Sequence, residues 1–138
     1  MGFLGDLFKR SEKSDPIDAL KEKADANPND ARLAQDLANQ LKAQGRLSEA
    51  QEYARRGAQA HMTAGFATKA LAVLKGAVGW GAPSMDLLQD LVDVLLKLKH
   101  KEDARGTLIQ LRKLHATAGN KSELGRIDAQ INELGPSR

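Results

Sequence analysis

The chain has 138 residues, the size of one domain. It has no cysteine, which excludes disulfides, thiolate metal sites and cysteine nucleophiles, and its three histidines offer little for a metal centre. The formal net charge of +3 is modest and only 4% of residues are aromatic, so we do not expect the dense basic, base-stacking surface of a nucleic-acid binder.

Residues 1–14 are predicted to be an amphipathic N-terminal segment, with a short helix, and a linker. On a helix, Phe3, Leu4, Leu7 and Phe8 share one face. The charges follow the apolar residues, unlike those of a secretory signal, and no run is long enough to span a membrane, so we predict a cytoplasmic protein. The apolar face could pack on protein, either this chain or a second copy, could bind a membrane surface weakly, or could have no partner.

Residues 15–135 are predicted to be entirely helical, and residues 136–138 to be a tail. Apolar residues recur at helical spacing, as Leu33, Leu37 and Leu41 do, and no segment alternates with the period of a strand. Glycine and proline separate the helical segments, with Pro16 at the start, Pro28 next and Gly135 at the end. Few aromatic and β-branched residues also favour helices over strands. We therefore predict an all-α fold of about seven helices.

The helical region repeats. A shift of 54 residues aligns residues 31–83 with 85–137, and Leu33 then meets Leu87, Gln35 meets Gln89 and His61 meets His115. Such repetition is typical of an α-solenoid, in which neighbouring units bury apolar faces that none could bury alone.

Residues 31–64 resemble one tetratricopeptide repeat, a helix-turn-helix unit of 34 residues. The residues that carry the likeness are apolar or small and lie at the packing and turn positions: Leu37, Ala38, Leu41, Gly45, Leu47, Ala50, Ala54 and Gly57. Residues 85–118 repeat the pattern with Lys99 at the turn glycine, and residues 53–83 give an overlapping third match. The resemblance implies a right-handed α-solenoid of antiparallel helix pairs that binds peptides on a concave face lined by first helices.

The candidate binding residues are polar side chains on the outer side of the first helices. They are Arg32, Gln35, Asn39 and Lys42 in one unit and Gln89, Asp93 and Lys97 in the other. Such side chains could fix the backbone amides and charges of a bound segment, or could form an ordinary solvated helix face. Some tetratricopeptide proteins clamp a C-terminal carboxylate with a Lys and an Asn; Asn39 matches, but Gln35 replaces the Lys, which argues against that clamp.

We predict a non-catalytic adaptor or scaffold for protein–protein interaction, with no cofactor and no metal. We also expect the protein to be bacterial. The sequence holds no phosphate loop and no recognisable catalytic set. His61 and His115 are expected to be structural, and Trp80 to be a packing anchor or an exposed contact. Two alternatives stay open, a chaperone for an assembly or secretion client and a membrane tether through the N-terminal helix. Self-association through that helix or through a solenoid end is also left open.

Overall fold

The computed structural model describes residues 16–136, and every regular element within them is an α-helix. The helices are α2 (Pro16–Ala26), α3 (Ala31–Ala43), α4 (Leu47–Thr63), α5 (Ala67–Val78), α6 (Met85–Lys97), α7 (Lys101–Ala118) and α8 (Lys121–Glu133). The prediction of an all-α chain with about seven helices is confirmed for this part of the chain.

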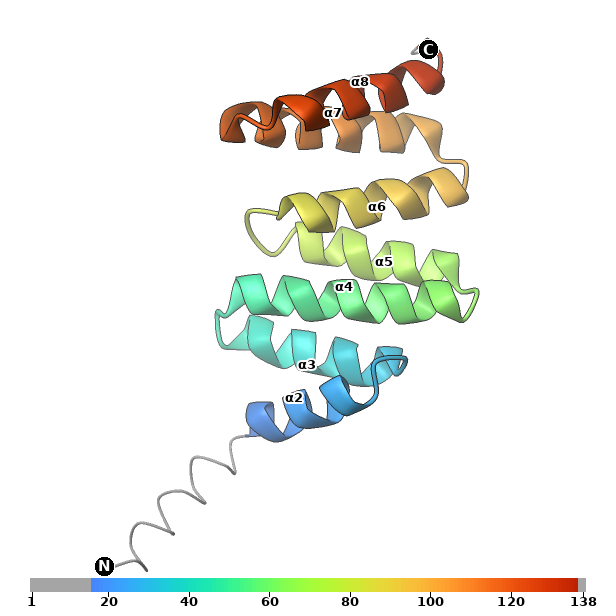
Figure 1. The fold of residues 1–138 in the computed structure, drawn as a ribbon. Helices are drawn as coiled ribbons and strands as arrows, with labels where there is room; N and C mark the ends of the chain where they lie inside the picture. The colour runs from blue at the N-terminus through green and yellow to red at the C-terminus, as the bar shows by residue number, and fades with distance from the viewer. Residues whose placement is uncertain (1–15, 137–138) are drawn as a thin grey trace, which may run out of the picture.

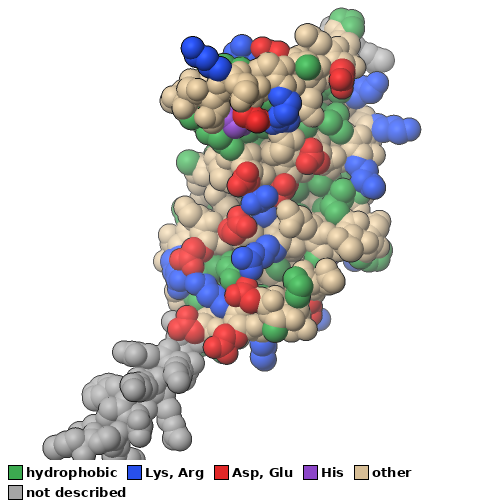
Figure 2. All heavy atoms as spheres, in the orientation of Figure 1, with side chains coloured by type: hydrophobic (Ala, Val, Ile, Leu, Met, Phe, Trp, Pro, Cys, Tyr) green, Lys and Arg blue, Asp and Glu red, His purple; other side chains and the backbone are tan. Residues whose placement is uncertain are grey.

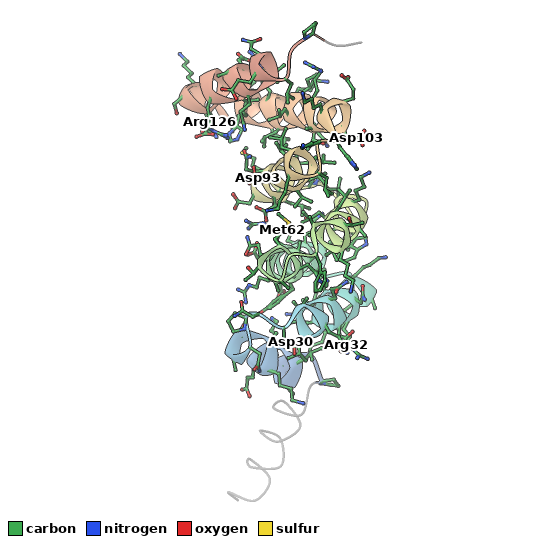
Figure 3. All side chains as sticks on the ribbon, turned by 90° about the vertical axis from the view of Figure 1, so that its right-hand side faces the viewer. Asp30, Arg32, Met62, Asp93, Asp103 and Arg126 are labelled. Atoms are coloured by element: carbon green, nitrogen blue, oxygen red, sulfur yellow. The ribbon has the colours of Figure 1, made fainter. Side chains whose placement is uncertain are left out.

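The helices stack into an elongated solenoid. Each helix packs against the next one in the chain, and neighbours run in opposite directions (Figure 1). Seen from the side, they form two rows, with α3, α5 and α7 in one row and α2, α4, α6 and α8 in the other (Figure 3). The fold is therefore a tetratricopeptide-like solenoid of antiparallel helix pairs, as the sequence predicts.

Capping residues explain where the two repeat units begin. Asp30 accepts a hydrogen bond from the Leu33 N–H at 3.1 Å and caps α3, and Ser84 accepts one from the Leu87 N–H at 3.0 Å and caps α6. Each side chain satisfies an N–H that has no partner within its own helix. Asp30 and Ser84 are equivalent under the 54-residue shift, so the repeat extends to the caps.

Four helices end in the same turn. In each of them the residue that follows the turn's positive-φ residue donates its N–H to the carbonyl five residues back, as Arg46 does to Leu41 at 2.9 Å and His100 to Leu95 at 2.8 Å. This turn needs one residue with positive φ, which favours glycine. Gly45 provides this conformation, with φ of 75°. The equivalent Lys99 has φ of 64°, and within residues 16–136 it is the one residue other than glycine with a positive φ.

Small residues let the helices approach closely. Ala50 and Ala104, at equivalent positions of α4 and α7, are fully buried. A Cβ added to Gly57 of α4 would lie 3.3 Å from the Gln35 Cγ and 3.5 Å from the Ala34 Cβ of α3. A larger side chain at these crossings would wedge the helix pair apart.

The core divides at α6. Leu87, Leu91 and Leu95 pack into a cluster that includes helices α2 to α5, while Leu88 and Val92 pack into a second cluster with α7 and α8. Because α6 is buried on both sides, it joins the two clusters into one stack. Leucine and alanine dominate both clusters, which fits the low aromatic content.

Substituting Lys99 by glycine should stabilise the fold. The left-handed backbone costs an L-residue about 1–2 kcal/mol, and glycine gives part of that back through its flexible unfolded state. We expect Lys99→Gly to raise the free energy of unfolding by about 0.5–1 kcal/mol in urea denaturation. Gly45→Lys, at the equivalent turn, should lower it by a similar amount, and equal effects of the same sign from both variants would contradict this reading.

Glu49 should make the stability depend on acid pH. It accepts from Arg46 Nη2 at 2.9 Å and Lys21 Nζ at 2.6 Å, and these hydrogen bonds, that of Arg46 first, lower the pKa of Glu49 from 4.5 to about 2. A carboxylate with a lowered folded pKa stabilises the fold above its unfolded pKa and loses that contribution as the pH falls towards the folded pKa.

We expect Glu49→Gln to lower the free energy of unfolding at pH 7 by less than about 1 kcal/mol, because the pair is half-exposed and solvent screens it. Near pH 2 the variant and the wild type should be equally stable. A deficit of the same size at both pH values, measured in urea, would refute the assignment.

Candidate functional site

A groove of about 460 Å³ lies between α3 and α5, with α4 as its floor. Its lining residues come from these three helices and from the turn after α5: Gln35, Ala38, Asn39, Ala54, His61, Lys69, Ala72, Val73, Gly76 and Trp80. The groove thus belongs to the row formed by α3, α5 and α7.

Small side chains keep the groove open. Ala54 lies on the α4 floor, and Ala72 and Gly76 lie on the α5 wall. A Cβ added to Gly76 would meet nothing within 4 Å, whereas one added to Gly57 would press on α3. The contact between α3 and α4 is therefore sealed, and the free space lies beside α5.

Amide side chains on α3 supply hydrogen-bonding groups to the groove. The Gln35 Oε1 lies 3.0 Å from His61 Nε2, while Asn39, one turn further on, is exposed. Burial, and then the nearby Lys69 charge, hold the pKa of His61 below its usual 6.5, so the ring is neutral at pH 7 and can donate its Nε2–H to Gln35. The Gln35 amide nitrogen stays available to a ligand.

A lysine lies over an aromatic ring near each end of the groove. Lys69 Nζ is 4.8 Å from the centroid of the Phe66 ring, and Lys42 Nζ is 5.1 Å from that of Trp80. The Phe66 ring is 51% exposed and Lys69 is exposed too, so this pair lies open to solvent. No carboxylate is among the residues that line the groove. The groove lining is therefore partly apolar. A lysine that has no carboxylate among the lining residues lies near each end.

The opposite row carries a ladder of polar contacts between helices. Lys21 pairs with Glu49, Arg56 with Asp25 at 2.6 Å, Arg55 with Asp90 at 2.8 Å, and Arg126 donates to Gln89 at 2.9 Å. These contacts link α2 to α4, α4 to α6, and α6 to α8. Basic and acidic side chains accordingly interleave along this face in Figure 2. Its charges are largely satisfied within the molecule.

The structure does not bring the two sets of predicted binding residues together. Gln35 and Asn39 line the groove, Lys42 lies over Trp80 at its end, and Arg32 is exposed on α3. Figure 3 places Asp93 and Arg126 on one side of the stack and Arg32 on the other.

The second set lies on α6. Gln89 donates to Asp93 at 3.0 Å and accepts from Arg126 of α8, and Lys97 is exposed near the end of α6. Asp93 borders a smaller hollow of about 210 Å³, together with Met62 of α4 and Leu74 of α5. The repeat unit contains three helices and the stack has two rows, so equivalent helices α3 and α6 fall in different rows.

Sequence reasoning missed the contribution of α5. Lys69, Val73 and Gly76 form one wall of the groove, and none of them was a predicted binding residue. Two signals were present in the sequence: α5 holds Lys69 and Lys75 without any acidic residue, and it has an exposed glycine, Gly76, in its last turn.

The predicted contact residues Phe3, Leu4, Leu7 and Phe8 lie outside the described residues, so their role stays a prediction. Within residues 16–136, no group of three or more His, Cys, Asp or Glu side chains is arranged to hold a metal ion. None of the helices described there is long and apolar enough to cross a membrane.

The helix order, the cap and turn contacts and the two-row stacking define a helical-repeat fold that is similar to that of tetratricopeptide proteins. No family model matches the chain, and no curated protein does. Among solved structures, the chain is similar to YrrB, described as a TPR protein with an unusual peptide-binding site: identity is 19%, 87% of this chain and 76% of that chain are covered, and the TM-score is 0.42.

Gly76→Ala should stabilise the fold, because the added Cβ meets only open space and alanine favours a helix over glycine by about 1 kcal/mol. Gly125→Ala is the matched control, since Gly125 is also exposed within a helix, on α8, and a Cβ there also meets nothing. Both variants should raise the melting temperature in thermal denaturation, Gly76→Ala by less than Gly125→Ala, because Gly76 lies in the last turn of α5 and Gly125 lies inside α8. A destabilised Gly76→Ala variant would mean that the α5 wall is not open.

Proposed function

We propose that this protein is a non-catalytic adaptor that binds an extended segment of a partner protein in the groove between α3 and α5. The observation that carries the proposal is the open groove itself, with a small-residue floor and free amide groups along one wall. Peptide backbone has unpaired N–H and C=O groups, which Gln35 and Asn39 could meet, while Val73 and Ala72 could contact apolar side chains.

The difference between the two rows supports this choice of face. Inter-helix ion pairs tie α2, α4 and α6 together, and charges that already have partners gain little from a ligand. On the groove side, Arg32, Lys42 and Lys69 have no carboxylate within ion-pair distance among residues 16–136. We assign the partner segment to this side, and therefore to Arg32, Gln35, Asn39 and Lys42 rather than to the α6 set.

Affinity capture with the full chain, quantified by mass spectrometry against two variants, tests the proposal. Gly76→Gln fills the groove without adding charge or apolar surface, and Gly125→Gln adds the same side chain to α8. Both substitutions should leave the fold intact, because glutamine is a better helix former than glycine.

We expect the partner of the wild-type protein to be lost with Gly76→Gln and retained with Gly125→Gln. The partner's contact region, mapped by cross-linking, should lie beside α3 and α5. A partner retained equally by all three proteins would exclude the groove as the binding site.

A further inference from the structure

We propose that the groove is specific for acidic segments, and that it reads two carboxylates about five residues apart in an extended chain, one near Lys69 and one near Lys42. The inference rests on the proposed function and names the chemistry of its partner. It follows from which charges lack partners, from where they lie, and from the hydrogen-bonding groups between them.

In the described part of the chain, three cations on the groove side have no carboxylate within ion-pair distance: Lys42, Lys69 and Arg32. Of the arginines within residues 16–136, Arg32 on α3 is the one without a carboxylate within ion-pair distance, whereas Arg55, Arg112 and the others each have one. The α5 wall carries lysines and no acid, and Asp36, the one acid of α3, does not line the groove. A negatively charged ligand would therefore meet positive charge in the groove, and no carboxylate on the α3 or α5 wall would repel it.

The positions of the two lysines set the spacing. Lys42 lies over Trp80, beyond the end of α5, and Lys69 lies in the first turn of α5. Lys69 lies nine residues before the end of α5 at Val78, which corresponds to about 14 Å at the rise of an α-helix, and Trp80 lies two residues further along the chain. An extended chain advances 3.2–3.4 Å per residue and covers the helical part of that length in about four residues, so the spacing that also reaches Trp80 is about five. Side chains five positions apart point to opposite sides of an extended chain, so one acidic side chain could meet Lys69 on α5 and the other Lys42 on α3.

The groups between the lysines favour an extended peptide over other anions. Gln35 keeps an amide donor free and Asn39 is exposed, so both can bond to peptide backbone, which a helical ligand would already have satisfied internally. A nucleic acid would need a longer basic track and free aromatic faces for its bases. Here the Phe66 and Trp80 rings already carry lysines over them.

The recognised carboxylates belong to side chains and not to a chain terminus. A single terminal carboxylate could meet only one of the two lysines, because Lys42 and Lys69 lie at opposite ends of the groove, so a segment that meets both needs an acidic side chain. Blocking the C-terminus of a ligand should therefore leave its affinity unchanged.

A display selection of random twelve-residue peptides on the full-length protein tests the inference. Selections on the wild type, on Gly76→Gln and on Gly125→Gln should be sequenced in parallel. We expect the wild type and Gly125→Gln to enrich peptides with two Asp or Glu residues about five positions apart, and Gly76→Gln to enrich none. The most enriched peptide is then synthesised with an amidated C-terminus and its affinity measured by fluorescence polarisation.

Replacing both acidic residues of that peptide by glutamine should weaken binding, and Lys42→Gln or Lys69→Gln in the protein should each weaken it by about three- to tenfold. Lys113→Gln, which removes an exposed lysine of α7 without a carboxylate partner, is the control and should have no effect. The losses from Lys42→Gln and Lys69→Gln should disappear with the glutamine peptide, because the ion pairs are then already absent.

The results separate failure of the inference from failure of the proposed function. Enrichment of neutral or basic peptides that still depend on an open groove would refute the acidic specificity and leave the adaptor function standing. Failure to enrich any groove-dependent peptide would refute both. Tighter binding of a single-stranded oligonucleotide or of vesicles with anionic lipid, lost with Lys42→Gln and Lys69→Gln, would also overturn the inference, since the same cations would then serve another class of ligand.

Discussion

The close contact between α3 and α4 is the constraint on which the rest of the structure depends. Gly57 and Ala50 present almost no side chain at this crossing, so the two helices approach until the Gln35 Cγ lies against the backbone of α4. This packing makes α4 the floor of the groove, and α5, the next helix in the stack, forms the wall opposite α3. Buried Gln51 then ties α4 to the end of α5 through the Ala77 carbonyl at 3.0 Å. The groove exists because the first contact is tight and the space beside α5 is not filled.

The two rows of the stack differ in how their charged side chains are paired. In the row of α2, α4, α6 and α8, charged side chains cross from one helix to the next and hold neighbours in register, as Arg55 does with Asp90. In the row of α3, α5 and α7, the described ion pair between helices is that of Lys75 with Asp103 at 3.9 Å. Charged side chains that are already paired within the molecule have little to gain from a ligand, whereas charged side chains without a partner can still form ion pairs with one.

Much of the fold could be read from the sequence. The apolar spacing, the caps and the turn glycines are local signals, and each of them predicts its own helix or boundary. Gln35 and Asn39 could be placed on the outer side of α3 because helical periodicity alone defines that side, and in the structure both line the groove. Assigning Gln89 and Asp93 to the same groove failed because a repeat period says which residues are equivalent and not which side of a two-row stack each copy faces. Gly76 and Lys69 were missed because the meaning of an exposed glycine or lysine depends on its neighbours in space.

The odd number of helices in the repeat has a consequence for how such a chain can grow. Because the unit has three helices and the stack has two rows, a copy of the unit presents the equivalent surface on the other side of the molecule (Figure 3). Gln35 accordingly lies in the groove with His61, whereas the equivalent Gln89 bonds to Arg126 in the opposite row. A further duplication of the same unit would return the next copy to the first side, so a binding surface would recur only in alternate units.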